Sequence, residues 1–159
     1  MWTEWDQTQG VGLRAAAARL GIEIFAPPLD GQVDAAAYRR VFDVLVQAGV
    51  GALVVSAGQQ NSVNSGTILG FARSARLPVM YPFRSYIAEG GLSAYGPDMA
   101  ELYRRMAGDV DEILRGAKPG DIPYVLPTTL SLVINMKTAD ALGLIIPPNV
   151  MARADELIE

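Results

Sequence analysis

The stretch Ala52-Leu53-Val54-Val55, followed by Ser56, is a continuous apolar run with the length of one β-strand. A run without alternating polar residues is typical of a strand that is covered on both faces, as in a parallel sheet flanked by helices. The sequence therefore predicts a parallel sheet at this position, with Ser56 at the end of the strand.

Helical and extended segments alternate on both sides of this run. Asp34 can cap the first turn of a helix that ends before Gly49, because its carboxylate can accept hydrogen bonds from free backbone amides. The expected helices cover residues 7–20, 34–48 and a stretch that ends at 76, the expected strands cover 22–25, 52–55 and 77–81, and a polar loop is expected over 57–61. This order predicts an α/β fold with a doubly wound, mostly parallel, Rossmann-like sheet. Its ligand crevice should lie beyond the carboxyl ends of the strands.

The last third of the chain has a different pattern. Residues 90–97 form an extended segment between glycines, and Asp98 then caps a long helix that reaches residue 116. Four apolar residues form one stripe along this helix: Leu102, Met106, Val110 and Ile113. Their full burial is worth about 1.5–3 kcal/mol each, or roughly 6–12 kcal/mol together, which is comparable to the stability of a whole domain. We therefore expect the stripe to lie against another protein surface.

Composition argues against several classes of function. The chain has no cysteine and no histidine, which removes Ser-His and Cys-His nucleophile pairs together with Cys/His metal sites. Its net charge of −4 argues against a basic surface for nucleic acid. We therefore expect no enzyme activity, no metal, no cofactor and no nucleic-acid partner. Residues 1–20 lack the basic and apolar segments of a secretory signal, so no signal peptide is expected in the chain itself.

Four ordered blocks carry a resemblance to a known family. They read LPVMYPFR (77–84), GGLSAYGPD (90–98), ILRGAKPGDIP (113–123) and LVINMKTADALGLIIPP (132–148). With these blocks the sequence resembles the ABC-transporter substrate-binding proteins of the tryptophan and tyrosine type. The resemblance implies the architecture of a type I periplasmic binding protein, in which two α/β lobes hold a solute between them. It also implies a periplasmic or other extracytoplasmic location and an ABC permease as partner.

The resemblance covers roughly the second half of a typical family member and implies a division of the chain. Residues 1–91 would form an incomplete second lobe, and residues 92–97 would cross to the first lobe. Residues 98–116 would be a helix belonging to that first lobe, and residues 117–159 would supply the return crossover strand and the C-terminal helices. We therefore expect a truncated chain in which helix 98–116 pairs with a second copy, as a homodimer or by domain swapping.

Two groups of residues follow the strands and are candidates for binding a solute. Ser56 and Ala57 end the first apolar run, where a hydroxyl and backbone amides could bind a ligand carboxylate. Tyr81, Phe83 and Arg84 follow the next strand, where aromatic rings could stack on a planar solute and the guanidinium could hold a carboxylate. A strand-ending serine without a ligand remains an alternative for Ser56, as does core packing for Tyr81.

Tyr95 and Gly96 complete the candidate set through the resemblance, which places them on the crossover at the floor of the cleft. Packing at a hinge is the alternative. The amides of 59–61 could also face a ligand, although simple solvation is the better interpretation. The implied solute is an amino acid or a similar small carboxylate.

Two other functions compete with solute capture. A truncated fragment could self-associate without binding a ligand. A nucleotide-binding Rossmann-like enzyme is suggested by Gly10-Val11-Gly12-Leu13-Arg14-Ala15, which fits G-x-G-x-x-G/A. That fingerprint requires a strand directly before it, and residues 3–9 are polar, so the enzyme is the weakest of the three hypotheses.

Overall fold

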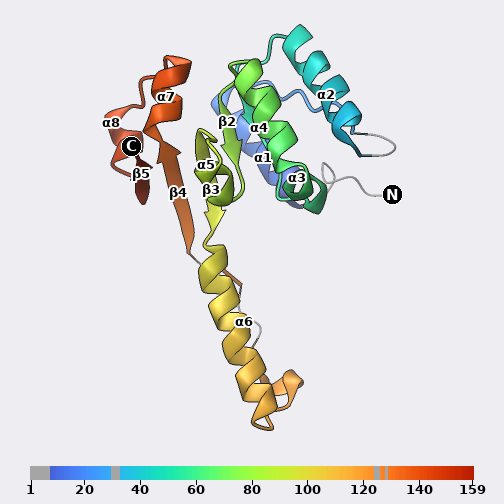
Figure 1. Cartoon of the computed structure of the whole chain (residues 1–159), viewed down its shortest axis with the longest axis vertical. Helices are drawn as coiled ribbons and strands as arrows, with labels where there is room; N and C mark the ends of the chain where they lie inside the picture. Colours follow the sequence, from blue (N-terminus) through green and yellow to red (C-terminus); the bar gives the residue numbers. More distant parts are fainter. Residues whose placement is uncertain (1–7, 30–32, 124–125, 128) are drawn as a thin grey trace.

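A five-stranded sheet forms the centre of the structure, a computed structural model that describes residues 8–29, 33–123, 126–127 and 129–159 (Figure 1). The strands are β1 (Leu53–Val54), β2 (Val79–Tyr81), β3 (Ser93–Pro97), β4 (Leu130–Asn135) and β5 (Glu156–Ile158), and they lie in the sheet in this order. Only β3 and β4 pair antiparallel, while the other three neighbouring pairs are parallel. The predicted α/β fold with a mostly parallel sheet is confirmed.

The helices begin and end close to the predicted signals. They are α1 (Thr8–Leu20), α2 (Ala35–Gln47), α3 (Gln59–Val63), α4 (Ser65–Ser74), α5 (Ser85–Ala88), α6 (Met99–Leu114), α7 (Met136–Leu142) and α8 (Pro148–Met151), with a 3₁₀ turn over Pro119–Asp121. Asp34 caps α2 as predicted, since its carboxylate accepts a 2.9 Å hydrogen bond from the amide of Ala37. Gly143 ends α7 with φ of 74°, a left-handed conformation that suits glycine.

The core lies where α2 and α4 pack beside the first strands. Tyr38 and Phe42 of α2 meet Ile68 and Leu69 of α4 in one buried cluster that also includes residues of β2, β3 and β4. The ring of Phe42 lies 5.1 Å from that of Phe71 on α4, measured between centroids. The sheet and these two helices therefore form a single hydrophobic core.

Three local expectations are wrong. Residues 22–25 are not a strand, because a strand needs a hydrogen-bonded neighbour and β1 pairs only with β2 in the described part of the chain. Val54 is 57% exposed, so β1 is not covered on both faces. The expected polar loop over 57–61 contains the start of α3. Strand β5 was not predicted at all.

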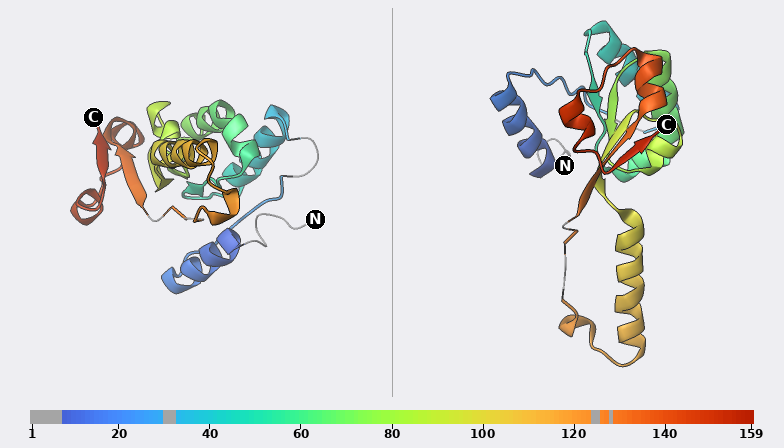
Figure 2. Two further views of the ribbon diagram at one scale, coloured as in Figure 1. Left: turned by 90° about the horizontal axis from the view of Figure 1, so that it is seen from below. Right: turned by 90° about the vertical axis from the view of Figure 1, so that its left-hand side faces the viewer.

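Residues 98–123 form a limb that projects from the body, as Figures 1 and 2 show. We call the described residues between 98 and 129 the limb and the other described residues the body. The chain leaves the body at Pro97 and returns at Leu130, which are directly paired in the antiparallel ladder. Asp98 caps α6 as predicted, yet no residue of α6 is buried. The apolar stripe therefore has no surface to lie against within the described chain.

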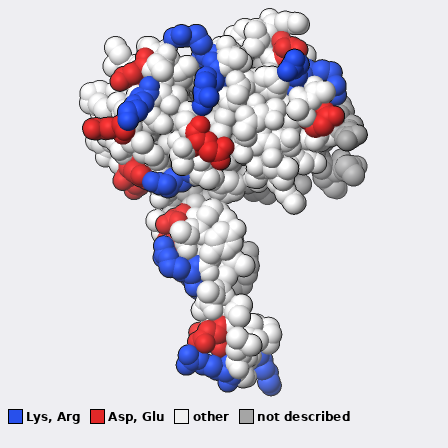
Figure 3. Space-filling view, in the orientation of Figure 1, with Lys and Arg blue, Asp and Glu red and all other residues white. Residues whose placement is uncertain are grey.

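The surface carries both signs of charge without a dominant patch in the view of Figure 3. Along the limb, charged residues gather beside an uncharged strip. None of the described helices is both long enough and apolar enough to cross a membrane. The first seven residues, which enter the argument about a signal peptide, lie outside the described ranges.

Candidate functional site

The register of the sheet brings most of the predicted binding residues to one edge. Val54 pairs with Met80, and Tyr81 pairs with Ala94. If the same pairing continues beyond these residues, Ser56 lies beside Pro82 and Pro82 lies beside Tyr95. These three residues then form one row just beyond the buried middle of the strands. Neighbouring strands lie about 4.8 Å apart, so the backbones of Ser56 and Tyr95 are separated by about 10 Å. We call this edge the rim, formed by Ser56, Ala57, Phe83, Arg84, Tyr95 and Gly96.

Ser56 is held in place by a small polar network. The side-chain amide of Asn61 donates to the Ser56 hydroxyl at 2.9 Å and to the Ser56 carbonyl at 3.1 Å. The hydroxyl of Tyr38 in turn donates to the Asn61 amide oxygen at 2.7 Å. The network ties the end of β1 to α2 and α3, and it fixes the position of Ser56 while Ala57 stays exposed.

Arg84 already has a carboxylate partner. Its Nε lies 2.7 Å from Oε2 of Glu156, and its Nη2 lies 2.6 Å from Oε1. This two-bond geometry is the one expected between a guanidinium and the carboxylate of a bound solute. The hydrogen bond to Glu156 raises the pKa of Arg84, and the same bond lowers the pKa of Glu156. Because both side chains are substantially exposed, the pair stabilises the fold by at most about 1 kcal/mol.

Tyr81 packs in the core and does not face the rim. It is 2% exposed, and its ring stacks on that of Tyr86 with centroids 4.7 Å apart. A side chain at Gly91 would meet the Tyr81 ring, since a Cβ there would lie 2.8 Å from Cε2. Burial, together with Tyr86, raises the pKa of Tyr81 to about 12. Tyr81 therefore packs in the core, which is the alternative to ligand contact that the sequence left open.

Strand β3 passes very close to the end of β2. A Cβ atom on Gly96 would lie 2.0 Å from the carbonyl oxygen of Pro82, so only glycine fits this contact. The neighbouring Tyr95 is 52% exposed. Phe83 is half-buried and packs against the core cluster. Tyr95 is thus the aromatic residue of the rim whose ring is open to solvent.

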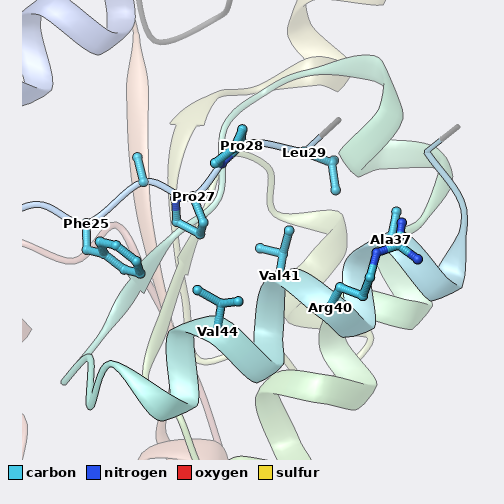
Figure 4. A pocket seen from close by; sticks show the side chains of 9 residues that line it. Phe25, Pro27, Pro28, Leu29, Ala37, Arg40, Val41 and Val44 are labelled. Atoms are coloured by element: carbon cyan, nitrogen blue, oxygen red, sulfur yellow. The ribbon is translucent and has the colours of Figure 1, made fainter. Parts of the chain in front are cut away.

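A separate open cavity of about 470 Å³ lies away from the rim (Figure 4). It is lined by the segment 25–29 and by residues of α2: Ala37, Arg40, Val41 and Val44. Apart from Arg40 the lining is mostly apolar, and the predicted site residues do not contribute to it. This cavity therefore offers few polar groups that could orient a solute.

The structure adds two residues that the sequence did not single out for this role. The sequence favours solvation of the Asn61 side chain, whereas the structure shows that this side chain anchors Ser56. Glu156, on a strand 72 residues further along the chain, accepts hydrogen bonds from the Arg84 guanidinium. No local sequence pattern could have indicated that contact. The described residues contain no group of three or more acidic, histidine or cysteine side chains that could hold a metal ion.

The glycines of the nucleotide-like motif do not form a phosphate-binding turn. Gly10 and Gly12 lie within α1, which begins at Thr8, so their amides are part of a helix and not of a loop between a strand and a helix. Residues 3–7, which precede the motif, lie outside the described ranges. Among the described residues, the motif glycines therefore do not supply the loop amides that the nucleotide hypothesis requires.

Comparison with solved structures defines the class of protein to which this fold corresponds. The chain is similar to the ABC domain of Streptococcus pneumoniae in complex with L-Trp, with a TM-score of 0.79 and 27% identity over 95% of this chain and 50% of that one. A conserved domain protein from Vibrio cholerae O1 biovar El Tor has a TM-score of 0.80 and 23% identity, over 94% of this chain and 49% of that one. The ligand-free, open structure of a substrate-binding protein with adhesive properties from Clostridium difficile has a TM-score of 0.62 and 17% identity, over 98% and 51%. The chain spans about half the length of each.

The family follows from the sequence match. Residues 38–158 match the family described as ABC transporter substrate binding protein, and the chain belongs to this family. A comparison with curated protein sequences gives no match. The family is one of solute-binding components and not a class of enzymes, and its members act outside the cytoplasm with ABC permeases.

Proposed function

We propose that this chain forms one wall of the solute-binding cleft of an ABC importer, and that the solute is an amino acid or a similar small carboxylate. The observation that carries the proposal is the match over 95% of the chain to an ABC domain that was solved in complex with L-Trp. We further propose that the chain acts in the periplasm or an equivalent compartment and that an ABC permease receives the solute.

The rim supplies groups suited to such a solute. Ser56 and the backbone at Ala57 can bind a carboxylate or amino group, and the exposed ring of Tyr95 can stack on a planar side chain. Arg84 can hold a carboxylate by two parallel bonds once Glu156 moves away. Gly96 lets the crossover strand lie against Pro82, which brings Tyr95 next to β2.

We also propose which residues of the chain belong to each side of the cleft. Residues 1–91 would form the wall, residues 92–97 would cross to the opposite side of the cleft, and the helix over 98–116 would belong to that opposite side. Residues 117–159 would supply the return crossing and the C-terminal helices, which rejoin the body from Leu130 onward. The return crossing includes residues 124–125 and 128, which lie outside the described ranges. One wall encloses less of a solute than the 70–90% typical of binding sites, so we expect affinity in the millimolar range for this chain.

Ligand-observed NMR of the 159-residue chain with L-Trp, L-Tyr, L-Leu and L-Glu tests the proposal. We expect saturation transfer to at least one of these amino acids, and we expect Tyr95→Ala to weaken it severalfold. Tyr103→Ala is the matched control, because Tyr103 is a similarly exposed tyrosine on the limb. Absence of transfer to all four amino acids at millimolar concentration would overturn the proposal, and an equal loss of transfer in both variants would overturn the role of Tyr95.

The contact of Arg84 with Glu156 gives a second and independent measurement. If a solute carboxylate uses Arg84, it competes with Glu156, and Glu156→Gln should increase the affinity severalfold. Glu89→Gln removes the same charge from an exposed residue elsewhere and should leave the affinity unchanged. If Glu156→Gln leaves the affinity unchanged, Arg84 is not a solute ligand.

A further inference from the structure

A chain of side-chain hydrogen bonds runs from the core to the rim through Asn61. The hydroxyl of Tyr38, a residue that is only 4% exposed, donates to Oδ1 of Asn61 at 2.7 Å. Nδ2 of Asn61 donates to the hydroxyl oxygen of Ser56 at 2.9 Å and to the carbonyl oxygen of Ser56 at 3.1 Å. Asn61 therefore joins a buried residue of α2 to a residue of the rim.

We propose that Asn61 is a positioning residue of the solute site. It holds Ser56 where the solute meets the rim, and the buried hydroxyl of Tyr38 holds Asn61. The inference rests on the proposed function, because it assigns to Asn61 a share in the affinity of the rim for an amino acid. Asn61 acts through Ser56 and does not itself bind the solute.

The chemistry of the partners decides which end of the Asn61 amide faces Ser56. A carbonyl oxygen can only accept a hydrogen bond, so the atom opposite the Ser56 carbonyl has to be the amide nitrogen. The hydroxyl of Tyr38 donates to the amide oxygen at the other end. Ser56 receives both N–H donors of the amide, so Asn61 has no further donor to offer a solute.

The sheet itself does not hold Ser56 in the same way. Strand β1 covers only Leu53–Val54, and the amide of Val55 makes one more sheet hydrogen bond, to the carbonyl of Met80 at 2.9 Å. Pro82, which follows β2 on the neighbouring side, has no N–H with which to extend the ladder. The Asn61 side chain therefore takes over from the ladder at the point where the strand reaches the rim.

Asn61→Asp tests the grip on Ser56. The variant keeps the shape of the side chain and an acceptor for Tyr38, but it places an oxygen where the Ser56 carbonyl needs a donor. In a ¹H–¹⁵N NMR titration with L-Trp we expect about fivefold weaker binding, as for the loss of one hydrogen bond. Asn64→Asp is the matched control. It introduces the same charge at the end of α3, where the amide of Asn64 donates to Gln60 and not to Ser56, and it should leave the affinity unchanged.

Tyr38→Phe tests the buried end of the network. Because Tyr38 is buried, a solute cannot touch its hydroxyl, and we expect the affinity to fall severalfold through Asn61. The double variant Tyr38→Phe/Asn61→Asp should bind about as weakly as Asn61→Asp alone, since both changes break one network. A double variant that is weakened by the product of the two single effects would overturn the network.

A measurement without solute separates this inference from the proposed function. ¹⁵N relaxation should give lower order parameters for the backbone of residues 56–58 in Asn61→Asp than in the native chain or in Asn64→Asp. Unchanged order parameters overturn the positioning role. If the native chain binds an amino acid and Asn61→Asp binds it equally well, only this inference fails. If the native chain binds none of L-Trp, L-Tyr, L-Leu and L-Glu, the proposed function fails and this inference fails with it.

Discussion

Gly96 illustrates how one residue positions the rim. Strand β3 must pass beside Pro82, and the space for a side chain is filled by a carbonyl oxygen 2.0 Å from where a Cβ would lie. Backbone atoms cannot rotate away as the end of a flexible side chain can. Any residue other than glycine would therefore push β3 away from β2 and move Tyr95 with it.

Gly96→Ala should lower the free energy of unfolding by about 2–3 kcal/mol, because relief of the clash needs a shift of the backbone. Gly108→Ala is the matched control. No atom lies within 4 Å of a Cβ at Gly108, and alanine in a helix interior gains about 0.5–1 kcal/mol over glycine. Urea denaturation followed by circular dichroism measures both variants, and equal stability of the two would contradict the close contact.

The raised pKa of Tyr81 predicts that the free energy of unfolding falls at high pH. Its pKa is about 12 in the folded chain and 10 in the unfolded chain, so the folded state retains its proton while the unfolded state loses one. The associated stability, on the order of 3 kcal/mol, is present below pH 10 and is lost as the pH rises to 12. Tyr81→Phe should flatten this part of the profile of unfolding free energy against pH. The same steep decline in the variant would assign it to other groups.

At the scale of elements, the sequence predicts what local interactions determine. Helices α2 and α6 begin where Asp34 and Asp98 cap them, and both caps form the expected hydrogen bonds. Residues 22–25 have the composition of a strand but no strand beside them, so the local preference is not realised. Strand β5 is three residues long and depends on pairing with β4, which a short local pattern cannot reveal.

The cap of α6 can be tested separately from the body. The carboxylate of Asp98 accepts from the amides of Ala100 at 2.8 Å and Glu101 at 3.3 Å, and Asp98→Ala should destabilise α6 by about 1 kcal/mol. Because no residue of α6 is buried, we expect faster amide hydrogen exchange over 99–114 with no change in the core. The measurement belongs at a concentration where the chain is monomeric. Asp98→Ser keeps a capping oxygen and should preserve protection, whereas faster exchange in the core would show that α6 supports the body.

At the scale of the whole molecule, the rim was only partly predictable. The alternation of strands and helices correctly placed Ser56 and Phe83 near strand ends, because the carboxyl ends of parallel strands meet at one edge. The occupation of Arg84 by Glu156 joins residues 72 positions apart and depends on the position of β5 in the sheet. Contacts of that kind follow from the folded topology, which no single segment determines.

The limb should be removable without loss of the body. Because Pro97 and Leu130 are paired, replacement of residues 98–129 by Asn-Gly would convert β3 and β4 into a hairpin with a two-residue turn. We expect this variant to unfold cooperatively and to stay monomeric in light scattering.

Replacement of residues 98–130 by the same Asn-Gly is the control. It shifts β4 by one residue against β3 and turns its buried side chains outward, so this variant should be much less stable. Equal stability of the two deletions would contradict the observed register.

The order of the strands has a consequence for synthesis on the ribosome. Since β1 to β5 lie in the sheet in the order in which they occur in the chain, each new strand emerges next to an edge that already exists. The parallel part from β1 to β3 can form before the rest is translated. Strand β4 must wait until the whole limb has left the exit tunnel, so the nascent chain exposes the edge of β3 for that interval and is most vulnerable to aggregation then.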